Sequence, residues 1–97
     1  MTTVDHVDHV GPVLDVDEVG DAVLAAIREA NADVTVIDRG SYRRVLVAQR
    51  CVVYRAAIER ALGRPFRLPA DLELVMPSFQ GTLELTDERA VWAWRSA

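Results

Sequence analysis

Apolar and polar positions in the first third of the chain predict one strand followed by one helix. The apolar run at residues 10–14 is typical of a short strand, and Pro12 favours an edge position because proline cannot donate to a ladder. Asp15 is predicted to cap the helix, with Glu18 completing a capping box. The apolar stripe at helical spacing comprises Val16, Val19, Val23, Ala26, Ile27 and Ala30. The positions predicted to face water are Asp17, Gly20, Asp21, Arg28 and Glu29.

Two further strands are predicted to form a hairpin. The helix ends at residues 31–33, and the β-branched run at 34–37 is typical of a strand. Gly40 and Ser41 form a two-residue link whose leading glycine is typical of a type II′ turn. The next strand, 42–47, alternates. One face carries Arg43, Val45 and Val47, and the other carries Tyr42, Arg44 and Leu46.

The second half of the chain predicts a similar order with a shorter helix. Residues 51–53 indicate a strand, and residues 54–62 indicate a helix that Gly63 ends in a left-handed conformation. Residues 78–81 are predicted to be a loop. The remaining apolar runs predict strands at residues 72–76, 82–85 and 90–94.

These elements define an α+β fold. The predicted order is a compact two-lobed βαββ-βαβββ arrangement, with helices packed on antiparallel sheets. A chain of 97 residues has room for a single core. We expect a flexible N-terminal tail at residues 1–9 and one domain at residues 10–97, with lobes at about 10–49 and 50–97.

Charge is unevenly distributed along the chain. The formal net charge is −4, but residues 1–33 carry −7, residues 34–67 carry +6 and residues 68–97 carry −3. A net acidic domain argues against nucleic acid as a partner. The basic middle segment is expected to form one face of a dipolar surface that orients a protein partner.

Composition also bears on the compartment. No apolar run reaches the ~18 residues that cross a bilayer, so no membrane partner is expected. The polar, acidic start is unlike a secretory signal. Cys51 is the single cysteine, which excludes an internal disulfide and favours a cytoplasmic location. Trp92 and Trp94 are expected in the core because each buries a large area.

Candidate catalytic chemistry is sparse. The chain has no lysine, which excludes Schiff-base chemistry, and its two histidines, His6 and His9, lie in the predicted tail. Together with Asp5 and Asp8, these histidines match no metal-binding spacing. Cys51 lies in an apolar run and is interpreted as a small core residue. We therefore predict no catalytic residue, no metal and no cofactor.

Several short motifs, taken in order, resemble one known family. The chain is similar to the effector (coupling or regulatory) proteins of soluble bacterial di-iron monooxygenases, which act on toluene, phenol, alkenes or methane. The resemblance extends from about Val10 to Trp94. The residues that carry it are Val36-Ile37-Asp38, Tyr42-Arg43-Arg44-Val45, Leu62-Gly63-Arg64-Pro65-Phe66, Leu72-Glu73-Leu74 and Ser78-Phe79-Gln80-Gly81.

The resemblance implies a cofactor-free protein that binds the di-iron hydroxylase oligomer of the same monooxygenase system. Docking would tune oxygen activation and substrate access, and would couple NADH use to hydroxylation or epoxidation of an aromatic hydrocarbon or alkene. A functional link to a reductase is implied, and to a ferredoxin if the system has four components. The absence of catalytic residues fits such a role.

Candidate docking residues fall in three segments. Tyr42 and Arg44 share one face of a strand, and an exposed pair there is either solvated or part of an interface. Arg64 follows a helix stop and is a candidate contact, while Gly63, Pro65 and Phe66 are interpreted as structural. The predicted loop is the strongest candidate, because loops on a rigid scaffold carry recognition. Its residues are Ser78, Phe79, Gln80 and Gly81.

Two other classes of function remain open from the sequence. One is a stand-alone βαββ-type module that binds a small molecule in an apolar pocket between the lobes. The other is a small enzyme, such as a cyclase or isomerase, that works through Asp38, Tyr42 and Arg44.

Overall fold

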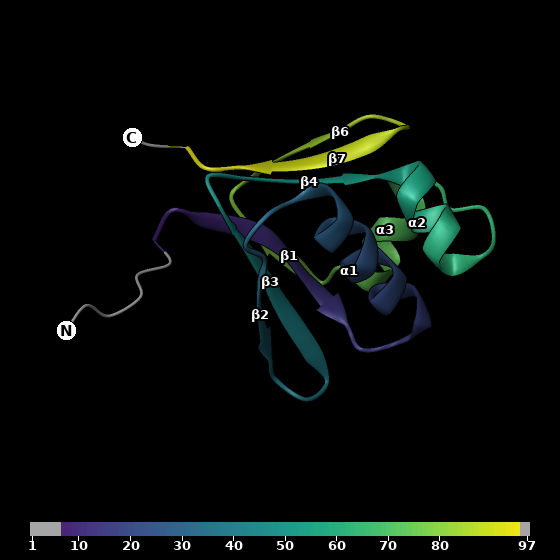
Figure 1. Ribbon diagram of the computed structural model, residues 1–97, viewed down its shortest axis with the longest axis horizontal. Coiled ribbons are helices and arrows are strands. Elements are labelled where there is room, and N and C mark those ends of the chain that lie inside the picture. Colours follow the sequence, from purple (N-terminus) through teal and green to yellow (C-terminus); the bar gives the residue numbers. More distant parts are fainter. Residues whose placement is uncertain (1–6, 96–97) are drawn as a thin grey trace.

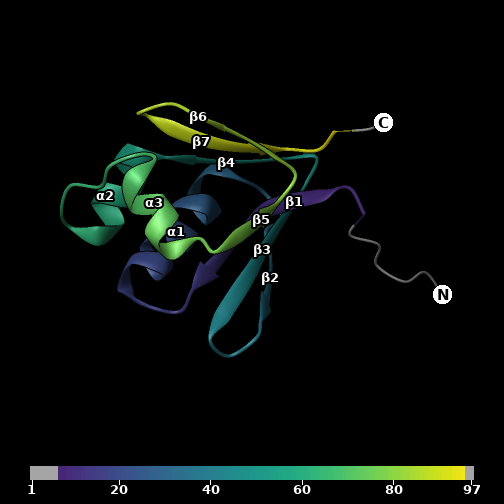
Figure 2. The same ribbon diagram turned by 180° about the vertical axis from the view of Figure 1, so that it is seen from behind.

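The computed structural model describes residues 7–95 and confirms the predicted α+β class. Two antiparallel sheets cross, and the helices pack at one end of them (Figures 1 and 2). The first sheet has the order β2-β3-β1-β5 and the second has the order β4-β7-β6. The elements are β1 (His9–Asp15), α1 (Glu18–Ala30), β2 (Thr35–Asp38), β3 (Tyr42–Ala48), β4 (Arg50–Tyr54), α2 (Arg55–Leu62), α3 (Ala70–Val75), β5 (Ser78–Gln80), β6 (Thr82–Leu85) and β7 (Arg89–Ala93).

One hydrophobic core joins the two sheets and the helices. Sheet residues from both halves of the chain contribute, including Val10 and Val45 from the first half and Trp92 from the second. Trp92 is fully buried, as predicted, whereas Trp94 is half-buried and packs against the core. Burial of apolar area of this kind is the main force that holds a small domain together.

The first half follows the predicted order, but the helix cap is different. Asp17, not Asp15, is the N-cap, and its carboxylate accepts a hydrogen bond from the backbone N–H of Gly20 at 2.7 Å. Asp15 instead ends β1, where it pairs with Tyr42. The prediction that Gly20 faces water is also wrong. Gly20 is buried, and a Cβ there would lie 2.0 Å from the carbonyl oxygen of Asp15.

Pro12 lies in an interior strand, so the predicted edge position is wrong. β1 is flanked by β3 and β5, and Pro12 is paired with Phe79 on β5. On the β3 side the paired positions skip from Val10 to Val13. Pro12 has no N–H to donate, but it lies where the hydrogen-bond ladder between β1 and β3 is interrupted. An interior strand can therefore accommodate it.

The predicted strand at residues 72–76 is wrong, because this segment forms helix α3. Leu72 and Val75 are buried and three positions apart, while Leu74 is 78% exposed, which matches a helical period and not an alternating one. Asp71 stabilises the start of the helix, since its carboxylate accepts a hydrogen bond from the backbone N–H of Arg67 at 2.8 Å.

The predicted loop at residues 78–81 is also different. Ser78, Phe79 and Gln80 form the short strand β5, and Gly81 makes the turn into β6 with a φ of 103°. β5 pairs with β1 of the first half and not with its neighbour β6. A segment from the second half therefore completes the first sheet.

The free edge of β4 is covered by a side chain. Asn31, at the C-cap of α1, accepts a hydrogen bond from Val52 N–H at 3.1 Å and donates to Val52 C=O at 2.7 Å. It also donates to the carbonyl of Ile27 at 2.8 Å. This side chain provides the contacts that a further strand would otherwise make, and it links α1 to the second sheet.

Candidate docking surface

Four of the candidate residues lie on one face of the first sheet. The pairing register places Ile37, Arg44, Val13 and Ser78 opposite one another on β2, β3, β1 and β5. Side chains registered in this way share a face. Tyr42 and Gln80 are two positions from Arg44 and Ser78 along their strands, so they share it too. The fold thus unites residues that are distant in sequence.

Arg44 is the centre of the polar contacts on this face. Its Nη2 donates to Oε1 of Gln80 at 2.9 Å, and Nε2 of Gln80 donates to the backbone carbonyl of His9 at 2.8 Å. Because arginine only donates, the Gln80 amide must turn its oxygen toward Arg44 and its nitrogen toward His9. The side chains of Arg44 on β3 and Gln80 on β5 are therefore joined across β1.

Two surface hollows meet at Arg44. One, of about 130 Å³, is lined by Pro12, Phe79 and Gln80 as well as by Arg44 and Ser78. The other, of about 390 Å³, is lined by Val13, Tyr42, Arg44, Pro77 and Ser78. Tyr42 is 38% exposed beside Arg44, and an exposed tyrosine next to an arginine is typical of protein–protein hot spots. Phe79 is 43% exposed, but it alternates with Ser78 and Gln80 and therefore faces the other side of β5.

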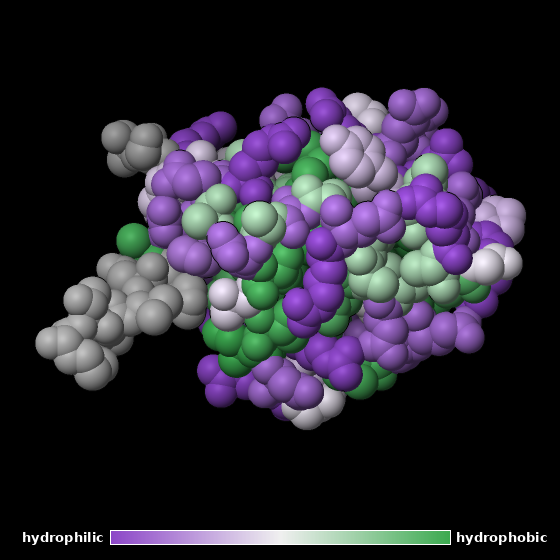
Figure 3. Space-filling model, in the orientation of Figure 1, coloured by the Kyte–Doolittle hydropathy of each residue, from purple (hydrophilic) through white to green (hydrophobic). Residues whose placement is uncertain are grey.

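Apolar side chains gather around β2, at the edge of the first sheet (Figure 3). Val36 and Ile37 are half-buried on this edge strand. Since Ile37 is registered opposite Arg44, the apolar area adjoins the polar contacts of Arg44.

Arg64 lies apart from the other candidates. It follows Gly63, which ends α2 with a φ of 79° as predicted, and its Nη1 is 2.7 Å from Oε1 of Glu18 on α1. Arg64 lines a hollow of about 210 Å³ together with Pro65 and Leu74. The structure therefore divides the candidates into a sheet group and a helix-end group.

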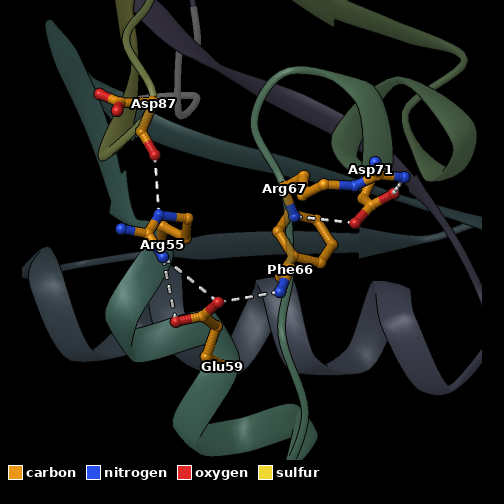
Figure 4. Close-up of polar contacts among 6 residues, drawn as sticks. All are labelled: Arg55, Glu59, Phe66, Arg67, Asp71 and Asp87. Atoms are coloured by element: carbon orange, nitrogen blue, oxygen red, sulfur yellow. Dashed lines mark hydrogen bonds and ion pairs between the residues drawn. The ribbon is translucent and has the colours of Figure 1, made fainter.

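The segment after Arg64 is held by Glu59 (Figure 4). The Glu59 carboxylate accepts from Phe66 N–H at 2.9 Å and from Nη1 of Arg55 at 3.3 Å. Nε of Arg55 donates in turn to the carbonyl of Asp87 at 2.8 Å. Phe66 is buried, which agrees with its structural interpretation.

Leu74 was missed by the sequence reasoning. The expected strand at residues 72–76 placed Leu72 and Leu74 on the same face, whereas the helix turns Leu74 outward. The spacing of Leu72 and Val75 was the available signal. Leu74 is the most exposed large apolar side chain of the described part of the chain.

Ion pairs join the acidic N-terminal segment to the basic middle segment. Asp21 of α1 pairs with Arg43 of β3 at 2.6 Å, and Glu29 of α1 pairs with Arg60 of α2. The expected basic face is thus partly neutralised by the N-terminal helix. Arg44 differs, because its described hydrogen bond goes to a neutral amide.

The three residues of the enzyme hypothesis do not converge. Asp38 is registered opposite Arg43, 3.8 Å from its Nε, and accepts from Gly40 N–H at 2.8 Å. Arg44 is the next residue along β3 and points to the opposite face from Arg43, as does Tyr42. This geometry gives Asp38, Tyr42 and Arg44 no shared cleft.

Other reactive groups have structural surroundings. Cys51 is buried as predicted, and desolvation raises the pKa of its thiol to about 12. The amide of Gln49 donates to Asp8 at 2.8 Å and is the main cause that lowers the pKa of the Asp8 carboxyl. Asp5 and His6, named with the tail, lie outside the described residues.

Nothing in residues 7–95 forms a helix long and apolar enough to cross a membrane. The described residues form a small α+β domain whose first sheet carries two surface hollows at Arg44. Residues 8–93 match the MmoB/DmpM family, and the chain belongs to that family. Its members are effector or regulatory components of monooxygenase systems and not the catalytic subunits.

Three known proteins illustrate what this chain is similar to. It is 41% identical over 98 residues to the effector subunit of the alkene monooxygenase system of Xanthobacter autotrophicus, covering 97% of this chain and 96% of that protein. A chain in a solved phenol hydroxylase–regulatory protein complex has a TM-score of 0.79 at 20% identity, covering 90% of this chain and 98% of that one. Methane monooxygenase regulatory protein B gives 0.70 at 21% identity, covering 98% of this chain and 71% of that one.

Proposed function

We propose that this chain binds the di-iron hydroxylase oligomer of a multicomponent monooxygenase as a non-catalytic effector. The observation that carries this proposal is 41% identity, over nearly the whole chain, to the effector subunit of an alkene monooxygenase system. The complex of a phenol hydroxylase with its regulatory protein, in which one chain shares this fold, supports a docking role. The cytoplasm is the proposed location, with NADH reaching the hydroxylase through a reductase and, in a four-component system, a ferredoxin.

The proposed docking surface is the sheet group, with Tyr42, Arg44, Ser78 and Gln80 on one face of the first sheet. It also includes Phe79, which alternates to the other face of β5 and is exposed there, and Gly81 in the turn that follows. Its side chains stand on paired strands, so little conformational freedom is lost when a partner binds. α3 and β5 lie on the same side of the molecule in Figure 2. The helix-end group, in which Arg64 and Leu74 line one hollow, is proposed as a second contact.

The proposed mechanism is a shift in the conformational populations of the hydroxylase. An effector can change an equilibrium only if it binds one state more tightly than another. Tighter binding to the state that activates oxygen and admits substrate would raise the yield of hydroxylated or epoxidised hydrocarbon per NADH. By linkage, reduction of the hydroxylase must then change its affinity for the effector.

A reconstituted assay tests this proposal. The cognate hydroxylase and reductase are supplied with NADH and a small alkene, and NADH consumption and epoxide are measured as this chain is added. We expect the epoxide formed per NADH to rise and to saturate near equal amounts of effector and hydroxylase active sites. The double variant Y42A/F79A is expected to need more protein for the same effect. Unchanged turnover and coupling, with no complex on gel filtration, would reject the proposed function.

A further inference from the structure

Arg44 is a half-buried cation with a neutral partner. Three arginines are half-buried in the described part of the chain: Arg43, Arg44 and Arg55. Arg43 contacts the carboxylate of Asp21, and Arg55 contacts that of Glu59. Arg44 donates to the Gln80 amide, and no carboxylate of residues 7–95 lies within ion-pair distance of it. A partly desolvated guanidinium gains more from a carboxylate than from an amide.

The surroundings of Arg44 leave its guanidinium accessible to a carboxylate of a partner. The hollow of about 390 Å³ is lined by Tyr42 and Ser78 as well as by Arg44. Both carry hydroxyl groups that can donate to a carboxylate. Gln80 holds one side of the guanidinium, because its own amide is anchored on the carbonyl of His9. Guanidinium N–H groups other than those on Nη2 can then serve an incoming ligand.

We propose that this hollow receives an aspartate or glutamate side chain of the hydroxylase, which pairs with Arg44. This inference rests on the proposed function and assigns the chemistry by which the partner is recognised. Charge complementarity selects the occupant, since Arg44 is the charged group among the five lining residues and two hydroxyl groups lie beside it. The lining side chains of Val13 and Pro77 can contact the methylene groups of an aspartate or glutamate. Gln80 is a positioning residue that orients Arg44, and Tyr42 shields the pair from water.

Binding measurements with matched charge variants test the inference. R44Q removes the guanidinium, and R39Q removes an exposed arginine of the same hairpin as a control of equal charge. We expect R44Q to raise the Kd for the hydroxylase at least about 30-fold, as is typical when one member of a buried charge pair is lost, and R39Q to change it less than about threefold. R44K is expected to lie between them, because an ammonium cannot form the bidentate pair. Equal Kd values for R44Q and R39Q would overturn the inference.

A second pair of variants keeps Arg44 in place. Q80E supplies a carboxylate from the chain itself and should compete with the hydroxylase side chain, whereas Q80M removes the amide without adding charge. We expect Q80E to bind at least about tenfold more weakly than Q80M, with both variants showing the cooperative melting of a folded domain. Equal affinities of Q80E and Q80M would contradict a carboxylate at Arg44.

A double-mutant cycle identifies the partner residue. Surface Asp→Asn and Glu→Gln variants of the hydroxylase are titrated with the wild-type effector and with R44Q. One of them should weaken binding of the wild type while leaving R44Q unaffected, which is the signature of a direct pair. Additive effects throughout would reject the pair. Failure of the wild-type chain to bind any hydroxylase would instead reject the proposed function as well.

Discussion

At the scale of single residues, the amide side chain of Asn31 makes the backbone hydrogen bonds that a neighbouring strand would otherwise make to β4. Asn31 satisfies both backbone polar groups of Val52 on the free edge of β4, and Val52 is buried. Buried backbone groups that lose their partners cost about 1–3 kcal/mol each. Asn31 was predicted only as part of a helix end, because its contact with Val52 joins residues 21 positions apart.

N31L is therefore expected to lower the free energy of unfolding by about 2 kcal/mol or more, since leucine has similar size but can neither donate nor accept. Urea denaturation followed by tryptophan fluorescence measures the change. A32L introduces the same side chain at the exposed neighbouring position and should change stability by no more than about 0.5 kcal/mol. Equal stabilities of N31L and A32L would show that the edge contact contributes nothing.

At the scale of elements, the segment at residues 70–75 shows where sequence patterns become ambiguous. Leu72, Glu73 and Leu74 alternate as in a strand, while Leu72 and Val75 have helical spacing, and six residues are too few to separate the two periods. Other segments gave clearer signals, namely the long apolar stripe of α1, the Gly63 stop of α2 and the Gly40–Ser41 link of the hairpin. α1, α2 and the β2–β3 hairpin were therefore predicted correctly. The cap at Asp17 was missed because two aspartates, 15 and 17, both precede the helix.

A matched pair of alanine substitutions tests the helical assignment of α3. L72A removes a fully buried side chain and should destabilise the domain by about 2–5 kcal/mol. L74A removes an exposed side chain from the same helix and should have almost no effect on stability. Chemical denaturation of both variants measures the difference. A strand would bury both leucines, so two similar losses of stability would contradict the helix.

At the scale of the whole molecule, pairing between distant segments brings the candidate docking residues together. The residue types at Tyr42, Arg44 and Ser78 pointed to a docking role, but the sequence could not place β5 beside β1, because that pairing joins segments more than 60 residues apart. The spatial distribution of charge also depends on long-range packing. Acidic residues of α1 pair with arginines of β3, of α2 and of the segment after α2, and these ion pairs partly neutralise the expected basic face.

The same long-range pairing predicts that neither half of the chain folds alone. Residues 1–49 would lack β5 and the core side chains of Ile58 and Trp92, and residues 50–97 would lack β1 and the buried face of α1. Halves of this size bury too little apolar area for a stable core. Each half, expressed separately, should give a poorly dispersed proton–nitrogen NMR spectrum and no cooperative urea transition. An equimolar mixture should recover the dispersion of the intact chain, because the core forms only when both halves are present. A cooperative transition in either half alone would show that the two sheets are independent units.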